Sequence, residues 1–269
     1  MDFTNLLYFD IHSHLNLPEF KDDLDEVIKR MEDNKVGTIV VGADFETSKK
    51  AVEIAENNEH IFASVGIHPS EVNKNFDFKL LEKLAGHNKV VAIGECGLDY
   101  FHDGGVSIED QRECFIRQIE IANELNKPLM LHIRNNPKDK TKDAYKDTLE
   151  ILKQYAEVHP EKGGVKGNVH FFAGNLEAAK NFTEFGFSIS FTGVITFSND
   201  YDEVIKNIPI EMIMPDTDCP YVAPVPYRGK RNEPIYVKEI VKKIAEIKDL
   251  PEDEVAKIMI LNTRRVFDF

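Results

Sequence analysis

The chain has 269 residues, of which 42% are apolar, and its formal net charge is -14 at pH 7. This acidic balance argues against a protein that wraps long nucleic acid by neutralising phosphates, because that mode of binding needs a basic surface. The three cysteines, Cys96, Cys114 and Cys219, are odd in number and lack CxxC spacing, so the sequence implies no disulfide framework and favours a reducing compartment.

Short apolar runs alternate with helical patterns along the whole chain. Eight runs predict strands: Leu6 to Ile11, Val36 to Val41, Ile61 to Ile67, Val90 to Ile93, Pro128 to Ile133, Gly167 to Phe172, Phe187 to Phe191 and Glu211 to Met214. They are nearly continuous in Val, Ile, Leu and Phe, as strands covered on both faces should be. Amphipathic stripes between them, such as Phe115, Ile119 and Ala122, predict helices. The pattern predicts an α/β fold, and the length fits a (β/α)8 TIM barrel of about 250 residues.

Two additional helices are expected at the C-terminal end, roughly at residues 234–248 and 252–267. Val237, Ile240 and Ile244 form an apolar stripe in the first, and acidic residues open the second, as the helix dipole favours. No linker, repeat or low-complexity tract divides residues 1–269, so we expect one domain. The N-terminus lacks a basic segment followed by an apolar one, and no run approaches a membrane span, so we expect a cytoplasmic protein without a membrane partner.

The first predicted strand leads into His12-Ser13-His14. Residues two apart share one face of a strand, so both imidazoles project together and make half of a metal site. The alternative is a surface pair, or one buried His with a local hydrogen bond, because short motifs often occur without the function.

Metal-binding residue types recur at or near the ends of the later predicted strands. They are His68 after the third, Glu95 at the fourth, His132 at the fifth, His170 in the sixth and Asp218 after the eighth. In a barrel these ends meet at one face, where barrel enzymes place their sites. Four His ligands with Glu95 and Asp218 are enough for two cations that share a bridging carboxylate. The alternative is scatter of the nine His, and the remaining ones, His60, His87, His102 and His159, are interpreted as surface residues.

The sequence does not decide the roles of three acidic residues near these positions. Asp99 fits a loop cap as well as a site residue. Asp216 and Asp218 fall on the same side by strand alternation, so spacing does not choose between them. By the same alternation Cys219 faces away, and we expect it to be neither ligand nor nucleophile.

Seven segments together resemble the TatD family of metal-dependent deoxyribonucleases. They are Phe9-Asp10-Ile11-His12-Ser13-His14, Gly66-Ile67-His68-Pro69, Gly94-Glu95-Cys96-Gly97-Leu98-Asp99, Leu131-His132-Ile133-Arg134, His170-Phe171-Phe172-Ala173-Gly174, Asp216-Thr217-Asp218-Cys219-Pro220 and Arg228-Gly229-Lys230-Arg231-Asn232-Glu233-Pro234. The resemblance runs from Asp10 to the tail at 262–267. It implies a single metallohydrolase domain, an amidohydrolase-type TIM barrel, that cleaves DNA phosphodiester bonds as an exonuclease, with single strands or strand ends as the DNA substrate.

The resemblance also implies a role for each site residue. His12, His14, Glu95 and Asp218 would hold one divalent cation, and Glu95, His132 and His170 the other. His68 matches the position that contacts phosphate. In the mechanism that we expect, Glu95 bridges, Asp218 accepts a proton from water as general base, and Arg134, Arg228 and Arg231 add phosphate contacts. For the loop that carries Arg228 and Arg231, the alternative is a solvated basic turn.

The identity of the cation and the substrate is less constrained. Imidazole-rich ligands favour Zn²⁺ or Mn²⁺ over Mg²⁺, whereas the resemblance implies activity with Mg²⁺. The chain departs from the family pattern at Asp216, where Glu is usual, at Cys219, at Phe171 to Ala173, and in a longer loop after Arg134. Two alternatives to the nuclease are an ester hydrolase such as a D-aminoacyl-tRNA deacylase, and a non-catalytic scaffold that is stabilised by metal.

Overall fold

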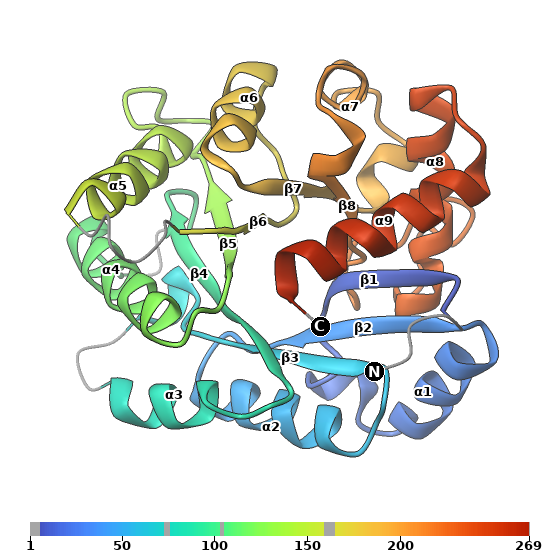
Figure 1. Cartoon of the computed structure of the whole chain (residues 1–269), viewed down its shortest axis with the longest axis horizontal. Coiled ribbons are helices and arrows are strands. Elements are labelled where there is room, and N and C mark those ends of the chain that lie inside the picture. Colours follow the sequence, from blue (N-terminus) through green and yellow to red (C-terminus); the bar gives the residue numbers. More distant parts are fainter. Residues whose placement is uncertain (1–5, 73–75, 103–104, 159–164, 269) are drawn as a thin grey trace.

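The computed structural model describes residues 6–72, 76–102, 105–158 and 165–268. Within them, eight parallel strands form one sheet in the order β1 to β8 (Figure 1). The strands are β1 Tyr8–Ser13, β2 Val36–Val41, β3 Ile61–Val65, β4 Val90–Asp99, β5 Leu129–Arg134, β6 Gly167–Val169, β7 Ser188–Phe191 and β8 Ile213–Pro215. The α-helices are α1 Leu24–Asp33, α2 Phe45–Glu56, α3 Phe78–Ala85, α4 Ile108–Glu124, α5 Ala144–Val158, α6 Leu176–Phe185, α7 Asp202–Asn207, α8 Val237–Lys248 and α9 Glu252–Phe267.

This architecture confirms the predicted (β/α)8 TIM barrel with extra C-terminal helices. Each predicted run contains or overlaps one strand, and β2 has the predicted bounds. Two details of the prediction were wrong. Strand β4 continues to Asp99, so Glu95 lies inside the strand and not at its end. Strand β6 stops at Val169, so His170 follows the strand, because Phe171 adopts a left-handed backbone conformation with φ 43°.

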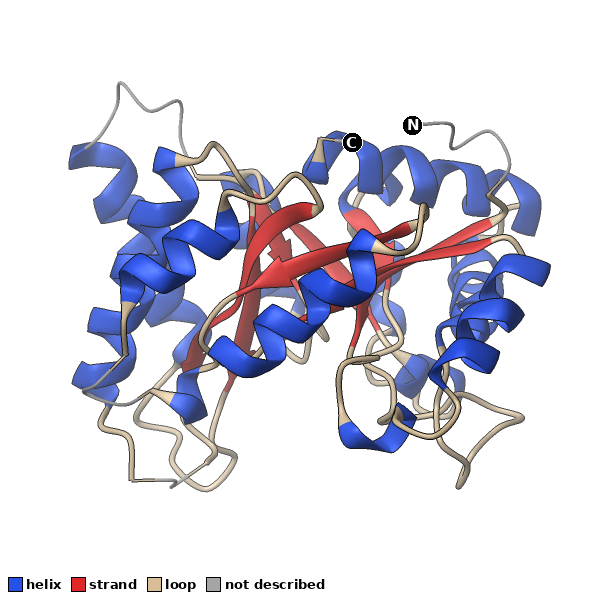
Figure 2. Cartoon of the chain, turned by 90° about the horizontal axis from the view of Figure 1, so that it is seen from below, coloured by secondary structure: helices blue, strands red, loops and turns tan. Residues whose placement is uncertain are grey.

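The helices surround the strands (Figure 2). The apolar core has two parts. One part lies between sheet and helices and includes the predicted stripes, with Phe115, Ile119 and Ile244 fully buried. The other contains alternate strand residues such as Ile39 and Met130, together with the end of α9. Helix α9 therefore packs against this second core at the N-terminal end of the barrel, and leaves the C-terminal ends of the strands as the open end, which we call the mouth.

The gap between β8 and β1 is closed by the segment 216–219, which runs beside the end of β1. The His14 amide donates to the Cys219 carbonyl (2.8 Å), and the Asp218 amide donates to the His12 carbonyl (3.0 Å). Beneath them, the buried carboxylate of Asp10 accepts hydrogen bonds from the Thr217 amide (2.8 Å) and hydroxyl (2.6 Å). Closure of the barrel therefore positions Asp218 beside His12 and His14.

We expect Asp10→Ala to lower the free energy of unfolding by about 2–5 kcal/mol, because two buried Thr217 groups lose their acceptor and each unsatisfied group costs about 1–3 kcal/mol. Denaturant unfolding measures the change. The exposed Asp22→Ala is the matched control and should change stability by less than about 0.5 kcal/mol. A change that small for Asp10→Ala would show that Asp10 does not hold the closure.

In the described ranges, none of the helices combines the length and the apolar character that a membrane crossing requires. All three cysteines are free and buried.

Candidate metal centre

A register shift in β1 turns His12 and His14 toward the inside of the mouth. The pairing of β1 with β2 slips between Asp10 and Ser13, as in a β-bulge. Asp10 and Ser13 both contact the Thr38 hydroxyl, whereas the Nε2 atoms of His12 and His14 lie 3.2 Å apart and face Glu95. The predicted shared direction of the two imidazoles is present, but a bulge contributes to it as well as strand alternation.

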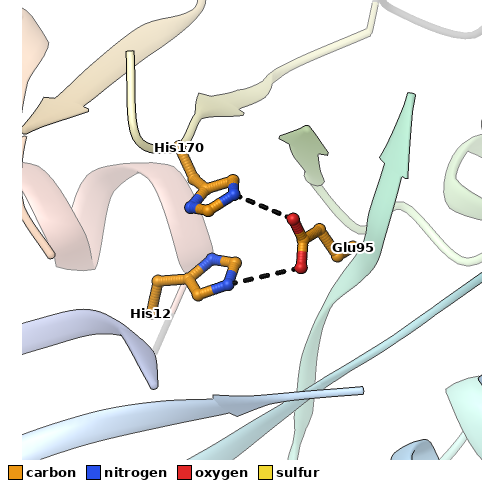
Figure 3. A group of neighbouring side chains, drawn as sticks. All are labelled: His12, Glu95 and His170. Atoms are coloured by element: carbon orange, nitrogen blue, oxygen red, sulfur yellow. Dashed lines mark hydrogen bonds and ion pairs between the residues drawn. The ribbon is translucent and has the colours of Figure 1, made fainter. Parts of the chain in front are cut away.

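A second register shift positions Glu95. The pairing of β4 with β5 slips between Ile93 and Cys96. Gly94 has φ +149°, and a Cβ atom there would lie 2.3 Å from the Met130 carbonyl oxygen, so only glycine fits. The Glu95 side chain is 6% exposed, and its carboxylate faces the imidazoles of His12 and His170 (Figure 3). These two rings stack on each other with centroids 3.7 Å apart, although they are 158 residues apart in the sequence.

The two oxygens of the Glu95 carboxylate face different groups of donors. Oε2 lies 3.6 Å from His12 Nε2 and 3.7 Å from His14 Nε2, and Asp218 Oδ1 lies 3.9 and 3.5 Å from the same two nitrogens. Oε1 lies 2.8 Å from His132 Nδ1 and 2.9 Å from His170 Nε2. These are the two ligand sets that the resemblance implies, joined by one carboxylate.

The spacing of the first set suits a cation. Donors about 2.1 Å from one metal ion lie about 3–3.5 Å from one another, and the measured separations fall close to this range. The Nε2 atoms of His12 and His14 lie 3.2 Å apart in a buried site, where two facing lone pairs without a donor are unfavourable. A positive charge placed between the two atoms would therefore be stabilising. Triads of potential ligand atoms, His12, Glu95 and His170; His12, His14 and Asp218; and His68, Glu95 and His132, each lie within 4.8 Å of one another.

The hydrogen bond on the other ring nitrogen distinguishes His14 and His132, which are expected to be ligands, from His68, which is expected to be a donor. His14 Nδ1 contacts the Val41 carbonyl (3.0 Å) and must carry the proton, which leaves the Nε2 lone pair for a cation. His132 Nε2 contacts Asp99 (3.1 Å), which leaves its Nδ1 lone pair toward Glu95. His68 Nδ1 instead accepts from the Ser70 amide (3.1 Å), so neutral His68 carries its proton on Nε2. That N–H, 3.7 Å from Glu95 Oε1, suits a phosphate oxygen better than a cation.

Charge neutralisation inside the cluster sets the pKa values. Burial alone would raise the pKa of Glu95, but the imidazoles of His170 and His68 outweigh it and hold that pKa well below its usual range. Burial would lower the pKa of His14, but Asp218 and Glu95 raise it to about 9. For His132, Asp99 and Glu95 outweigh burial and likewise raise the pKa to about 9.

Cation binding at pH 7 should therefore release about one proton each from His14 and His132. His14 and His132, with pKa values of about 9, are protonated at pH 7, and a cation has to displace both protons. Affinity should rise from pH 7 to 9 and level off above. Titration calorimetry in buffers of different ionisation enthalpy measures the release. His132→Gln should release about one proton fewer, and release of none by the wild-type protein at pH 7 would contradict this assignment.

Asp99 and His102 extend the centre toward solvent. Asp99 Oδ1 caps the amides of Phe101 and His102, and its Oδ2 contacts His132 Nε2 and His102 Nδ1. Asp99 is thus both cap and site residue. The interpretation of His102 as an ordinary surface residue missed this contact. The prediction missed it because β4 continues to Asp99, beyond the predicted end of the strand at Ile93. His159 lies outside the described residues.

The structure separates the two acids after β8. Asp218, at φ 50°, turns its carboxylate to His14, and the imidazoles outweigh burial to lower its pKa. Asp216 Oδ2 instead accepts from the Ser190 hydroxyl (2.5 Å) and the Phe171 amide (3.1 Å), so it braces the turn after His170. Alternation did not apply to this pair because β8 ends before it, at Pro215.

The three arginines proposed from sequence have different environments. Arg134 and Arg228 are exposed at the mouth. Arg231 donates to both oxygens of Asp23 (2.7 and 2.6 Å) and to Glu233 (3.2 Å), which ties the loop after β8 to the residues before α1. Its donors are engaged within the chain, so we no longer propose a phosphate contact for Arg231.

The barrel and the imidazole–carboxylate centre at its mouth define a metal-dependent hydrolase of the TIM-barrel type, and similar proteins agree. YabD of Bacillus subtilis, named an uncharacterized metal-dependent hydrolase, is 40% identical over 268 residues that cover 97% of this chain and 99% of YabD. YcfH of Escherichia coli K12, with the same description, is 33% identical over 96% of this chain and 94% of YcfH.

Within that class, the chain belongs to the TatD family. Residues 9–268 match the family described as TatD related DNase. The crystal structure of YjjV, a TatD homolog from Escherichia coli K12, superposes with a TM-score of 0.84 at 26% identity and covers 98% of each chain. A TatD family hydrolase from Entamoeba histolytica gives a TM-score of 0.81 at 25% identity, over 97% of this chain and 98% of that one.

Proposed function

We propose that the chain hydrolyses phosphodiester bonds of DNA, acting as an exonuclease on single strands or strand ends. The observation that carries the proposal is the Glu95 carboxylate, whose two oxygens face two separate sets of imidazoles. The description of the family as TatD related DNase supports the choice of DNA. Two bound divalent cations, Mg²⁺, Mn²⁺ or Zn²⁺, would supply an acidified water and offset the charge of the phosphate.

Each side chain then has a definite task. Glu95, His12, His14 and Asp218 would hold one cation, and Glu95, His132 and His170 would hold the other. Asp218, whose pKa is lowered, is an anion at neutral pH and accepts the proton that the attacking water loses.

The groups proposed to bind the substrate are His68, Arg134 and Arg228, the last of which also donates one hydrogen bond to the Ala223 carbonyl (2.9 Å). Burial and the neighbouring His132 lower the pKa of His68 to about 3, so His68 is neutral at pH 7 and donates its Nε2–H to a phosphate oxygen. Arg134 and Arg228 supply positive charge at the mouth of an otherwise acidic protein.

A nuclease assay with metal removal tests the proposal. Protein treated with chelator should not degrade a labelled single-stranded oligonucleotide, and added Mg²⁺, Mn²⁺ or Zn²⁺ should restore the activity. His132→Ala should reduce activity by more than about a hundredfold, since even partners outside the ligand shell contribute 10–100-fold. The matched control is His87→Ala, which removes an imidazole paired with Glu56 (2.9 Å) away from the centre. Wild-type rates from folded His132→Ala would refute the ligand assignment.

The same preparation separates the proposal from its alternatives. Hydrolysis of D-aminoacyl esters with no cleavage of DNA would favour the deacylase. Absence of turnover on both substrates with every added cation would favour a metal-stabilised scaffold. A reducing, cytoplasmic location is part of the proposal and is supported by three cysteines that are free and buried.

A further inference from the structure

The exposed aromatic side chains of the described residues all lie at the mouth. The sequence contains 18 Phe and 8 Tyr, and nearly all of those described are buried or half-buried. The exceptions are Phe101 (39% exposed), Phe197 (45%) and Tyr221 (49%). They follow β4, β7 and β8 respectively, and we call them the rim aromatics. Exposed aliphatic residues, by contrast, also occur elsewhere, as Leu261 does on α9.

Two of the rim aromatics carry an arginine on the ring. The guanidinium carbon of Arg134 lies 4.1 Å from the ring centroid of Phe101, and that of Arg228 lies 3.9 Å from the centroid of Phe197. A guanidinium plane and an aromatic ring are both surfaces on which a nucleobase stacks. Each pair therefore combines a stacking surface with a positive charge for the adjoining phosphate.

The polypeptide fixes these rings relative to the metal centre. The Phe101 amide donates to Asp99 Oδ1 (2.7 Å), while Oδ2 of the same carboxylate contacts the proposed ligand His132. The Tyr221 amide donates to the carbonyl of Asp218 (2.9 Å), and its ring centroid lies 6.4 Å from that of His14. Phe101 is thus tied to one ligand set and Tyr221 to the other.

The two Phe–Arg pairs occupy different sides of the mouth. Phe101 and Arg134 follow β4 and β5, whereas Phe197 and Arg228 follow β7 and β8, three strand positions further around a ring of eight. The loops of the second pair are joined by a hydrogen bond from the Val225 amide to the Thr196 hydroxyl (2.9 Å). A polynucleotide that places one phosphate at the metal centre would meet a stacking surface on each side of it.

We propose that the rim aromatics stack unpaired nucleobases on both sides of the phosphate that is cleaved, and thereby select single-stranded DNA. The inference rests on the proposed nuclease function and names the residues that recognise its substrate. Bases in a duplex are already stacked on their neighbours and offer no free face, so only unpaired bases gain this contact. Stacking also explains how a protein of net charge -14 holds a polyanion with few phosphate contacts.

Binding to two oligonucleotides of equal charge tests the proposal. The probes are labelled (dT)12 and an abasic strand of the same length, measured by fluorescence anisotropy in chelator so that no cleavage occurs. The wild-type protein should bind (dT)12 about tenfold or more tighter than the abasic strand, which corresponds to ~1.4 kcal/mol, within the range for stacking of one base. Equal binding of the two strands would overturn the proposal.

Variants assign the effect to the rings. Phe101→Leu and Phe197→Leu keep an apolar side chain but remove the aromatic face, so each should weaken (dT)12 binding several-fold without changing abasic binding. Phe101→Trp should restore binding. Leu261→Ala, an exposed position on α9, is the control and should have no effect. Unchanged (dT)12 binding by both Leu variants, or Trp no better than Leu, would overturn the assignment.

A substrate without bases separates this inference from the proposed function. The Leu variants should hydrolyse the abasic strand at the wild-type rate while their KM for (dT)12 rises. A wild-type protein that discriminates the two strands but cleaves neither would refute the nuclease and leave base stacking supported. A protein that cleaves DNA but binds the two strands equally would refute the stacking proposal and leave the nuclease function supported.

Discussion

Glu95→Gln should abolish DNA hydrolysis and reduce bound metal from two ions per chain to fewer than one. Among the described residues, Glu95 supplies the only carboxylate within 4 Å of imidazole nitrogens of both sets. The amide has no charge to offset two cations, and its NH₂ group would point at one of them. Losing several kcal/mol of transition-state stabilisation corresponds to a rate reduction of more than about a thousandfold. Elemental analysis of dialysed protein and a nuclease assay measure the two effects.

The control for this prediction is a second carboxylate–imidazole pair. Glu56 contacts His87 Nε2 at 2.9 Å outside the centre, so Glu56→Gln removes the same charge without touching the ligands. It should retain two metal ions and full activity. Far-UV circular dichroism of Glu95→Gln checks that the barrel is folded. Two tightly bound ions in a folded Glu95→Gln protein would show that Glu95 is not the bridge.

The second large effect is expected from Asp218→Asn, with kcat reduced by about 10²–10⁴-fold, the usual contribution of a general base. Asn retains one oxygen near His14 and His12. The set of Glu95, His132 and His170 does not include residue 218, so it should still bind its cation. The rates are compared at saturating cation, so that a lower kcat reports the loss of proton transfer and not the loss of an ion.

Asp253→Asn is the matched control, because Asp253 is an exposed carboxylate at the start of α9 that pairs with Lys257. It should leave kcat unchanged. An Asp218→Asn protein whose rate is reduced less than about tenfold would assign the proton transfer to another group.

The sequence predicted the fold because barrel strands are read by a simple rule. Strands that are covered on both faces are nearly continuous apolar runs, and all eight strands are predicted in this way. The C-terminal helices are predicted from an amphipathic stripe and from acidic residues at a helix start. The ends were less accurate. Strand β4 continues through Gly94 and Gly97, at φ +149° and +136°, and residues of this kind do not look like the middle of a strand.

The candidate centre was predicted as a set of residues, but its geometry was not. His12, His14, Glu95, His132, His170 and Asp218 do converge at the mouth, and their role as ligands stays a prediction. The shifts of register in β1 and β4 that aim His12 and Glu95 depend on pairing with other strands, which one segment of sequence does not reveal. The support of His132 by Asp99 is a tertiary contact of the same kind.

Arg231 shows that a functional residue can also be predicted where the structure does not support one. Its basic neighbourhood, Arg228 to Arg231, suggested phosphate binding, but the bidentate contact with Asp23 joins residues 208 positions apart. A local charge pattern cannot distinguish a free cation from one that is neutralised by a distant acid. Arg134 and Arg228, which rest on Phe101 and Phe197, remain available.

The most direct test of the dinuclear centre is an anomalous-scattering map from crystals grown with Mn²⁺ or Zn²⁺. Two peaks should flank the Glu95 carboxylate, the first beside the Nε2 atoms of His12 and His14 and the Oδ1 atom of Asp218. The second should lie beside His132 Nδ1 and His170 Nε2. A map with no peak at these atoms, or with its ions bound by other residues, would contradict the assignment of this centre.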